Sequence, residues 1–257
     1  MDIKVSTYER SEENRSKWNR SLVGFAQITF DDSYVLDQIY IKQARNGDYY
    51  IELPGIDVRK KDENGNYVEK PGGNYEKEKL EVFHPITATA RQELQAAVIH
   101  AFRDKRGEKD VLDTITGKFE PDAKYSRITP YEKDDQLAFG SVCFGDFVLE
   151  RVQLVKKADG TGNKFQSPQR KVKVQDKDNP EEKVTALKAW FFPITSEAGK
   201  NMLDAIEKSY NNALQAKADS AQLSKENAQG ASLDEELSLS AFEDVIDVAP
   251  KTNGIKR

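Results

Sequence analysis

Two distant segments of this chain are nearly the same. FHPITATARQELQAAVIHAF, residues 83–102, is followed later by FFPITSEAGKNMLDAIEKSY, residues 191–210. Both contain Pro-Ile-Thr, and the apolar positions that follow keep the same spacing. Self-similarity at a distance indicates repeated structural units and has to be settled before any other assignment. The repeat therefore predicts that the chain folds from two similar parts.

A second match lies upstream of each segment. AQITFDDSYVLDQI, residues 26–39, resembles GSVCFGDFVLERV, residues 140–152. Phe30 aligns with Phe144 in this comparison, and Val35 aligns with Val148. Two matches in the same order, at similar separations, favour a duplicated domain over chance.

Each copy shows the same change of periodicity. Apolar and polar residues first alternate, as in GFAQITF and YVLDQIYI, and a period of two predicts strands with one buried face. The short turns DDS and GD predict hairpins. A charged ribbon is predicted around NGNYVEKPGGNYEKE, residues 64–78, and further strands at RKVKVQ, residues 170–175, and KVTALKAWFF, residues 183–192. Gly72-Gly73 and Asn179-Pro180 mark the predicted ribbon tips. After each Pro-Ile-Thr the apolar spacing becomes three and four, which predicts a helix.

The Pro-Ile-Thr segments are interpreted as corners between a strand and a helix. Thr87 and Thr195 are suited to cap the helices, because a threonine hydroxyl accepts a hydrogen bond from a free backbone N–H of the first turn. Proline fits just before a helix, where no backbone donor is needed. The predicted fold class is α+β, with two copies of a small antiparallel sheet followed by one C-terminal helix, plus a disordered tail.

These patterns give domain boundaries. We predict a first copy over residues 1–106, a linker over 107–123 and a divergent second copy over 124–216. Residues 217–257 are rich in Ala, Ser, Gln and acidic residues and are predicted to be a mostly disordered acidic tail. Within it, the amphipathic segment 232–250 is suited to fold onto a protein partner, or to dock on its own domain.

Net charge, cysteine content and the absence of long apolar runs limit the classes of function to consider. The chain of 257 residues has a formal net charge of −5, which argues against a surface coated in basic residues but allows a local basic patch. Its single cysteine, Cys143, fits a reducing cytoplasm and is expected to be a buried structural thiol. No long apolar run and no leader pattern is present, so we expect a cytoplasmic protein without a membrane partner.

Few residues are candidates for catalysis or metal binding. Two histidines and one cysteine make a zinc site of the Cys/His type unexpected. His84 is replaced by Phe192 in the second copy, which favours packing at the corner over chemistry. No phosphate-binding glycine loop and no nucleophile with a matching base is visible. We therefore expect no catalytic residue, no metal and no cofactor.

The first copy contains a series of short motifs: AQITFD at 26–31, YVLDQI at 34–39, NGDYYIELP at 46–54 and HPI at 84–86, followed by Arg91 and LQAAV at 94–98. In this order the motifs resemble the SpoVG family, bacterial septation and sporulation regulators. The second copy is similar but degraded, with FQSP at 165–168 in place of the longer run and Gly199 where the arginine would stand.

The resemblance implies a non-enzymatic regulator that binds DNA or RNA. Family members resemble small dimers that pair through sheet edges, so the two copies are expected to form such a pair within one chain, with further dimerisation open. The implied nucleic-acid-binding residues are Arg59, Lys60, Lys61, Arg91, Arg170, Lys171, Lys173 and Lys200.

Two readings of these cations stay open. Lysine and arginine bind phosphates through charge, and Tyr67 and Tyr75 are placed to stack on bases. Cations on strand edges also guard against aggregation, and charge runs are commonly solvated surface. The alternative function is a protein-interaction adaptor that uses the sheet edges and the acidic C-terminal segment.

Overall fold

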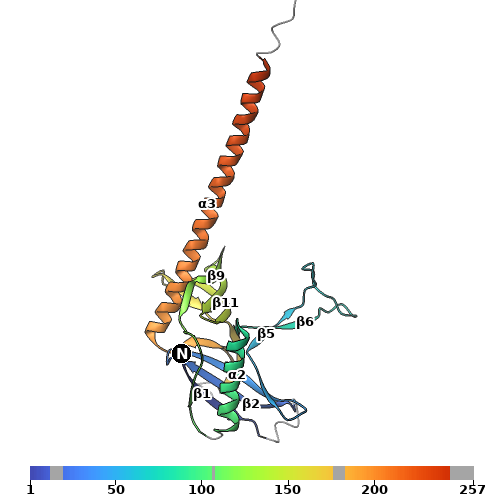
Figure 1. Cartoon of the computed structure of the whole chain (residues 1–257), viewed down its shortest axis with the longest axis vertical. Helices are drawn as coiled ribbons and strands as arrows, with labels where there is room; N and C mark the ends of the chain where they lie inside the picture. Colours follow the sequence, from blue (N-terminus) through green and yellow to red (C-terminus); the bar gives the residue numbers. More distant parts are fainter. Residues whose placement is uncertain (12–19, 106–107, 176–182, 244–257) are drawn as a thin grey trace, which may run out of the picture. The chain divides into compact units, whose positions relative to one another are not determined.

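A computed structural model describes residues 1–11, 20–105, 108–175 and 183–243, with side chains described as far as Ser224 (Figure 1). The chain divides into two compact units, Met1–Tyr210 and Asn211–Arg257. The first unit, here called the body, contains every strand of the described residues. Its fold is α+β, as predicted.

Two antiparallel sheets and two hairpin ribbons make up the strands of the body. The six-stranded first sheet consists of β1 (Asp2–Glu9), β2 (Leu22–Phe30), β3 (Tyr34–Gln43), β4 (Tyr49–Glu52), β8 (Val111–Thr114) and β15 (Phe191–Pro193). The five-stranded second sheet consists of β7 (Phe83–Pro85), β9 (Pro121–Lys133), β10 (Gln136–Phe144), β11 (Phe147–Lys156) and β12 (Asn163–Gln166). The ribbons are β5 (Gly55–Arg59) with β6 (Lys77–Glu81), and β13 (Gln169–Gln175) with β14 (Lys183–Ala189).

The two sheets exchange one short strand each. β7, from the first half of the chain, pairs with β11 of the second sheet. β15, from the second half, pairs with β3 of the first sheet. The pairings correspond residue by residue: Leu149 faces Phe83 across one, and Leu36 faces Phe191 across the other. Each sheet is therefore completed by the strand that precedes the helix of the other half.

Backbone details repeat on both sides of this exchange. The Asp37 N–H donates to the Trp190 carbonyl at 2.7 Å, and the Glu150 N–H donates to the Val82 carbonyl at 2.8 Å. The residues that follow, Gln38 and Arg151, have φ angles of 64° and 60°. A positive φ is uncommon for such residues. Its recurrence at matching positions shows that the two halves share local geometry as well as element order.

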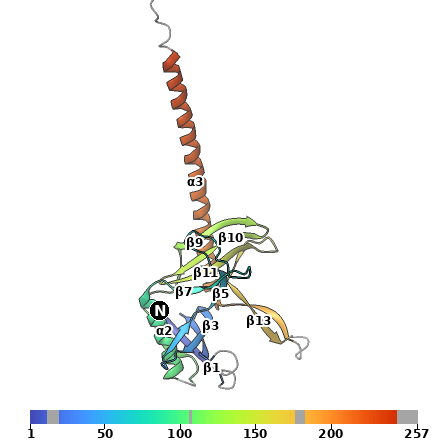
Figure 2. The same ribbon diagram turned by 90° about the vertical axis from the view of Figure 1, so that its right-hand side faces the viewer.

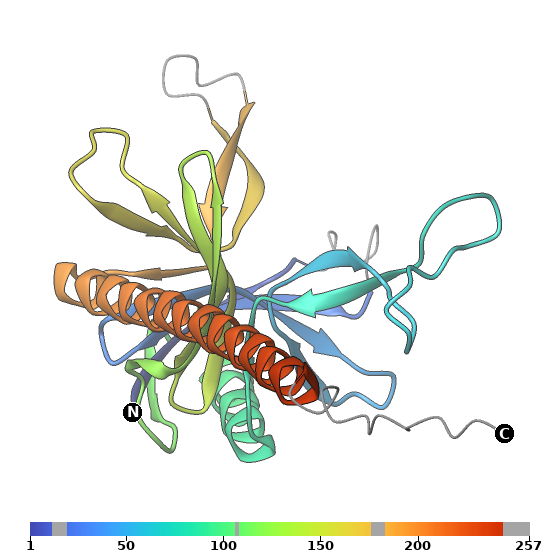
Figure 3. The same cartoon turned by 90° about the horizontal axis from the view of Figure 1, so that it is seen from above.

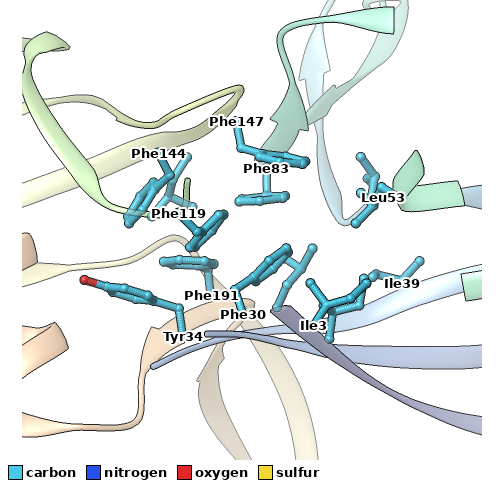
Figure 4. Packing of buried hydrophobic residues seen from close by; sticks show 14 of the residues in the cluster. Ile3, Phe30, Tyr34, Ile39, Leu53, Phe83, Phe119, Phe144, Phe147 and Phe191 are labelled. Carbon is cyan, nitrogen blue, oxygen red and sulfur yellow. The ribbon is translucent and has the colours of Figure 1, made fainter. Parts of the chain in front are cut away.

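One hydrophobic core spans both halves. Phe83 and Phe191, one from each exchanged strand, stack with centroids 5.5 Å apart (Figure 4). Phe119 stacks on Phe30 at 4.1 Å. Tyr34 donates its hydroxyl to the Ala198 carbonyl at 3.0 Å, and burial raises the pKa of this tyrosine to about 12. Because both exchanged strands contribute rings to this cluster, we infer that neither half completes the core alone.

Both predicted corners are present. β7 leads into α2 (Ala88–Arg103), and β15 leads into α3 (Ser196–Glu243). The Thr87 hydroxyl accepts from the Ala90 N–H at 3.1 Å, and the Thr195 hydroxyl accepts from the Ala198 N–H at 3.0 Å. Each threonine thus satisfies a donor that the first turn leaves free. The capping prediction is confirmed at both positions.

Residues 107–123, predicted as a linker, also contribute to the body. Within this segment β8 pairs with β1 along Val111–Thr114. Phe119 is buried among the rings of the core. The segment therefore connects the halves, adds an edge strand and supplies a core residue, because its spaced apolar residues find a partner sheet.

The C-terminal segment differs from our expectation of a mostly disordered tail from residue 217. α3 continues through residues 217–243, in which Ala, Glu and Leu are common, and these residues have high helix propensity. Residues 244–257 lie outside the described part of the chain. The amphipathic segment 232–250 lies partly in α3 and partly beyond the described residues. Its binding to a protein partner stays a prediction.

Candidate nucleic-acid interface

The second ribbon carries three lysines on one face. The strand β13 of this ribbon is labelled in Figure 2. Its register sets Lys171 opposite Leu187, Lys173 opposite Thr185, and Gln175 opposite Lys183. Side chains alternate along a strand and directly opposed residues share a face. Lys171, Lys173 and Lys183 therefore form one cationic row, here called the lysine face, and all three are exposed. Lys171 and Lys173 were predicted from the sequence, whereas Lys183 was missed.

Arg170 points to the opposite face and has a different role. Its guanidinium lies 2.9 Å from a carboxylate oxygen of Asp37 on β3, and the Lys188 ammonium lies 2.8 Å from the same oxygen. Burial alone would raise the pKa of Asp37, but Lys188 and Arg170 outweigh it, so the pKa lies below its usual range. Arg170 thus links the second ribbon to the first sheet through an ion pair. Because its guanidinium is engaged there, it is less available to a ligand than predicted.

The first ribbon brings its predicted cations and tyrosines together. The Arg59 guanidinium lies 4.4 Å from the ring centroid of Tyr75 and 5.7 Å from that of Tyr67. The Lys61 ammonium lies 5.3 Å from the Tyr67 centroid, and Lys60 pairs with Glu76 at 3.4 Å. Cation–π contacts of this kind order the hairpin. The four residues Arg59, Lys61, Tyr67 and Tyr75 form one cluster on the ribbon.

The two helix cations pair with local acids. Arg91, on α2, pairs with Glu81 at 2.7 Å. Lys200, on α3, lies 4.0 Å from Asp204 one turn along the helix. Exposed pairs of this kind contribute little to stability and are easily exchanged for a ligand. Neither residue belongs to the lysine face or to the cluster on the first ribbon.

The outer face of the second sheet was missed by sequence reasoning. Tyr131 and Phe139 are 45% and 43% exposed, and their ring centroids lie 5.5 Å apart. Tyr125 is exposed further along β9, with the Lys124 ammonium 5.1 Å from its ring centroid. Arg127 is exposed between the two tyrosines. The signal was the alternation YSRITPY over residues 125–131, which places aromatic and basic residues on one side of a strand.

His84 has a partner that the sequence did not indicate. Its Nε2 lies 3.3 Å from a carboxylate oxygen of Glu150, across the exchanged strand pair. The Glu150 hydrogen bond raises the pKa of His84 above 6.5 against the opposing effect of burial, and Glu81 adds to the rise. The contact joins the two halves. His84 therefore contributes an electrostatic interaction at the corner in addition to the packing predicted from the sequence.

The His84–Glu150 contact predicts a pH dependence of stability. A raised folded-state pKa adds stability that is complete below the unfolded value near 6.5 and is lost as pH rises through the folded value. His84→Phe, which copies residue 192, should remove this component. Urea midpoints measured at about pH 6 and about pH 8 should differ less in the variant than in the parent chain. An unchanged difference would show that the contact does not titrate with folding.

The last features to consider are the single cysteine, metal-binding groups and membrane-spanning helices. Cys143 is a free, buried thiol, and burial raises its pKa. Among the residues described, no group of three or more His, Cys, Asp or Glu side chains is arranged to hold a metal ion. Over the same residues, no helix has both the length and the apolar character needed to cross a membrane.

An antiparallel sheet that leads through a capped corner into a helix, with a charged ribbon between, defines a small α+β domain. The family model named SpoVG matches residues 1–104, which end one residue beyond α2. Over these residues, fewer than half of the chain, the protein is thus similar to the SpoVG family. Comparison with curated proteins and with solved structures found no match.

Proposed function

We propose that this protein is a non-enzymatic regulator that binds DNA or RNA through the lysine face of its second ribbon. The single observation that carries the proposal is the register that aligns Lys171, Lys173 and Lys183 on one exposed face. Clustered cations bind phosphates by charge and release counterions, independently of sequence. The cluster of Arg59, Lys61 and two tyrosines on the first ribbon supports the same function.

We further propose that the two halves act as a dimer built into one chain. The reciprocal pairing of β7 with β11 and of β15 with β3 supports this arrangement. A two-fold related pair places the same surface on both partners. Within one chain the copies are free to diverge, and the ribbons here differ in charge. The second ribbon is then the specialised phosphate-binding element.

The test is charge reversal on the lysine face. Lys171→Glu with Lys173→Glu should weaken binding of the full chain to a labelled oligonucleotide about tenfold or more near physiological salt. It should also lower the salt slope by roughly one per lysine. Both side chains are exposed, so the fold should be unaffected. Fluorescence anisotropy measures the affinity, and circular dichroism checks the fold.

A matched control separates the site from net charge. Lys109→Glu with Lys208→Glu makes the same change at two exposed lysines outside both ribbons. This variant should bind nearly as the parent chain does. Equal weakening by both double variants would mean that only the net charge matters, and no weakening by the first would overturn the assignment to the second ribbon.

A further inference from the structure

A hollow of about 300 Å³ lies where the second sheet meets the bases of the ribbons. Arg151 and Gln153 of β11 and Gln166 of β12 line it, together with Ser167, Trp190 and Ile56 of the first ribbon. The lining combines amide groups, one cation and an indole ring. Figure 3 shows the two ribbons projecting from the body.

The hollow lies beside a pair of residues that differs between the two halves. The Asp37 carboxylate on β3 of the first half pairs with Arg170, which lies at the base of the second ribbon. Lys188, the cross-strand partner of Arg170, pairs with the same carboxylate. The matching pair on the first ribbon is Ile56 and Leu80, also cross-strand partners. Ile56 is shorter than arginine and carries no charge. The corresponding space in the second half is thus left open beside Ile56.

One buried polar atom in the hollow has no protein partner. Ser167 is only 8% exposed, and its hydroxyl makes no hydrogen bond with the described residues. Buried hydroxyls are usually paired, and an exception calls for an explanation. The equivalent residue of the first half, Leu53, has no such requirement.

An aromatic surface continues from the hollow. Phe139 on β10 is the direct cross-strand partner of Gln153, so both side chains lie on the outer face of the second sheet. Tyr131 contacts Phe139 at 5.5 Å between centroids. Exposed aromatic rings beside cations are the arrangement on which bases of single strands stack.

We infer that the hollow holds one base of a single-stranded nucleic acid, while the next base stacks on Phe139. Glutamine amides both donate and accept hydrogen bonds, as base edges require. Arg151 complements the negative backbone. The inference rests on the proposed nucleic-acid binding and specifies its substrate class, because a paired base is not free to enter such a hollow.

Tryptophan fluorescence gives a direct test on the full chain. Trp18→Phe leaves Trp190 as the only tryptophan, so its emission reports on the hollow. A single-stranded oligonucleotide of about a dozen nucleotides should quench Trp190 in a saturable way. An abasic strand of equal length, which keeps sugars and phosphates, should bind more weakly and leave the emission unchanged.

Variants separate this inference from the proposed function. Phe139→Ala, or Gln153→Ala with Gln166→Ala, should weaken single-strand binding roughly five- to a hundredfold and spare duplex binding. All three side chains are exposed, so folding should be intact. If abasic and base-carrying strands bind and quench alike, or these variants bind as the parent does, the base site is wrong while phosphate binding stands. If no oligonucleotide binds, both proposals fall.

Discussion

Phe191→Ala is expected to lower the free energy of unfolding by about 3–5 kcal/mol, the range for removing a fully buried phenylalanine. Phe191 has no exposed surface. Its ring centroid lies 5.2 Å from that of Phe144 and 5.6 Å from that of Tyr34. Because β15 completes the first sheet, the cavity opens at the joint between the halves. Urea unfolding followed by circular dichroism measures the change.

The neighbouring residue supplies the control. Phe192 lies on the same strand but is only partly buried. Phe192→Ala removes the same atoms and should cost about 1 kcal/mol or less, as a surface-facing change does. Both variants should unfold in one transition. Two separate transitions, with only one shifted by Phe191→Ala, would show that the halves fold independently and would contradict a shared core.

Gly140→Ala is the second large effect, at about 1–3 kcal/mol of destabilisation from overpacking. A Cβ at position 140 would lie 1.9 Å from the Arg127 carbonyl oxygen and 2.9 Å from the Ile128 Cα on the next strand. Both contacts are backbone, so β9 itself has to move. The first half carries Ala26 at the equivalent place, and comparison of the copies alone would predict a neutral change.

Gly199→Ala is the matched control. This glycine lies in the first turn of α3, and a Cβ would meet only a proline ring carbon at 3.7 Å, an ordinary contact. Alanine in a helix is favoured over glycine by about 0.5–1 kcal/mol. The variant should be as stable as the parent chain or more stable. Thermal unfolding compares the two glycine variants, and a tolerated alanine at 140 would mean that the strands are less closely packed there.

Much of the fold follows from local pattern. The change of period after Pro85 and Pro193 predicts each helix, and a threonine at the corner predicts each cap, because these effects act within a few residues. The strand exchange could not be predicted. FHP and FFP have the same apolar pattern, so either strand suits either sheet. Which sheet each strand joins depends on packing between segments far apart in the chain.

The candidate site was predicted in part. A run of basic residues at 170–173 is visible in the sequence, but the pleat separates them: Lys171 and Lys173 face outward, whereas Arg170 meets Asp37. Lys183 joins them only through the ribbon register. The hollow at Ile56 arises from three-dimensional contacts between the halves, which no local pattern records.

The most direct measurement of the central claim is the salt dependence of oligonucleotide binding by the full chain. Fluorescence anisotropy, followed from about 50 to about 200 mM salt, gives the affinity at each concentration. Our account predicts binding at low salt and a logarithm of affinity that falls linearly with the logarithm of salt concentration. The lysine face, with three cations, should contribute roughly two to three units of that slope, at about 0.7 per phosphate contact on a single strand and about 0.9 on a duplex. Absence of binding at the lowest salt, or binding that salt does not change, would contradict it.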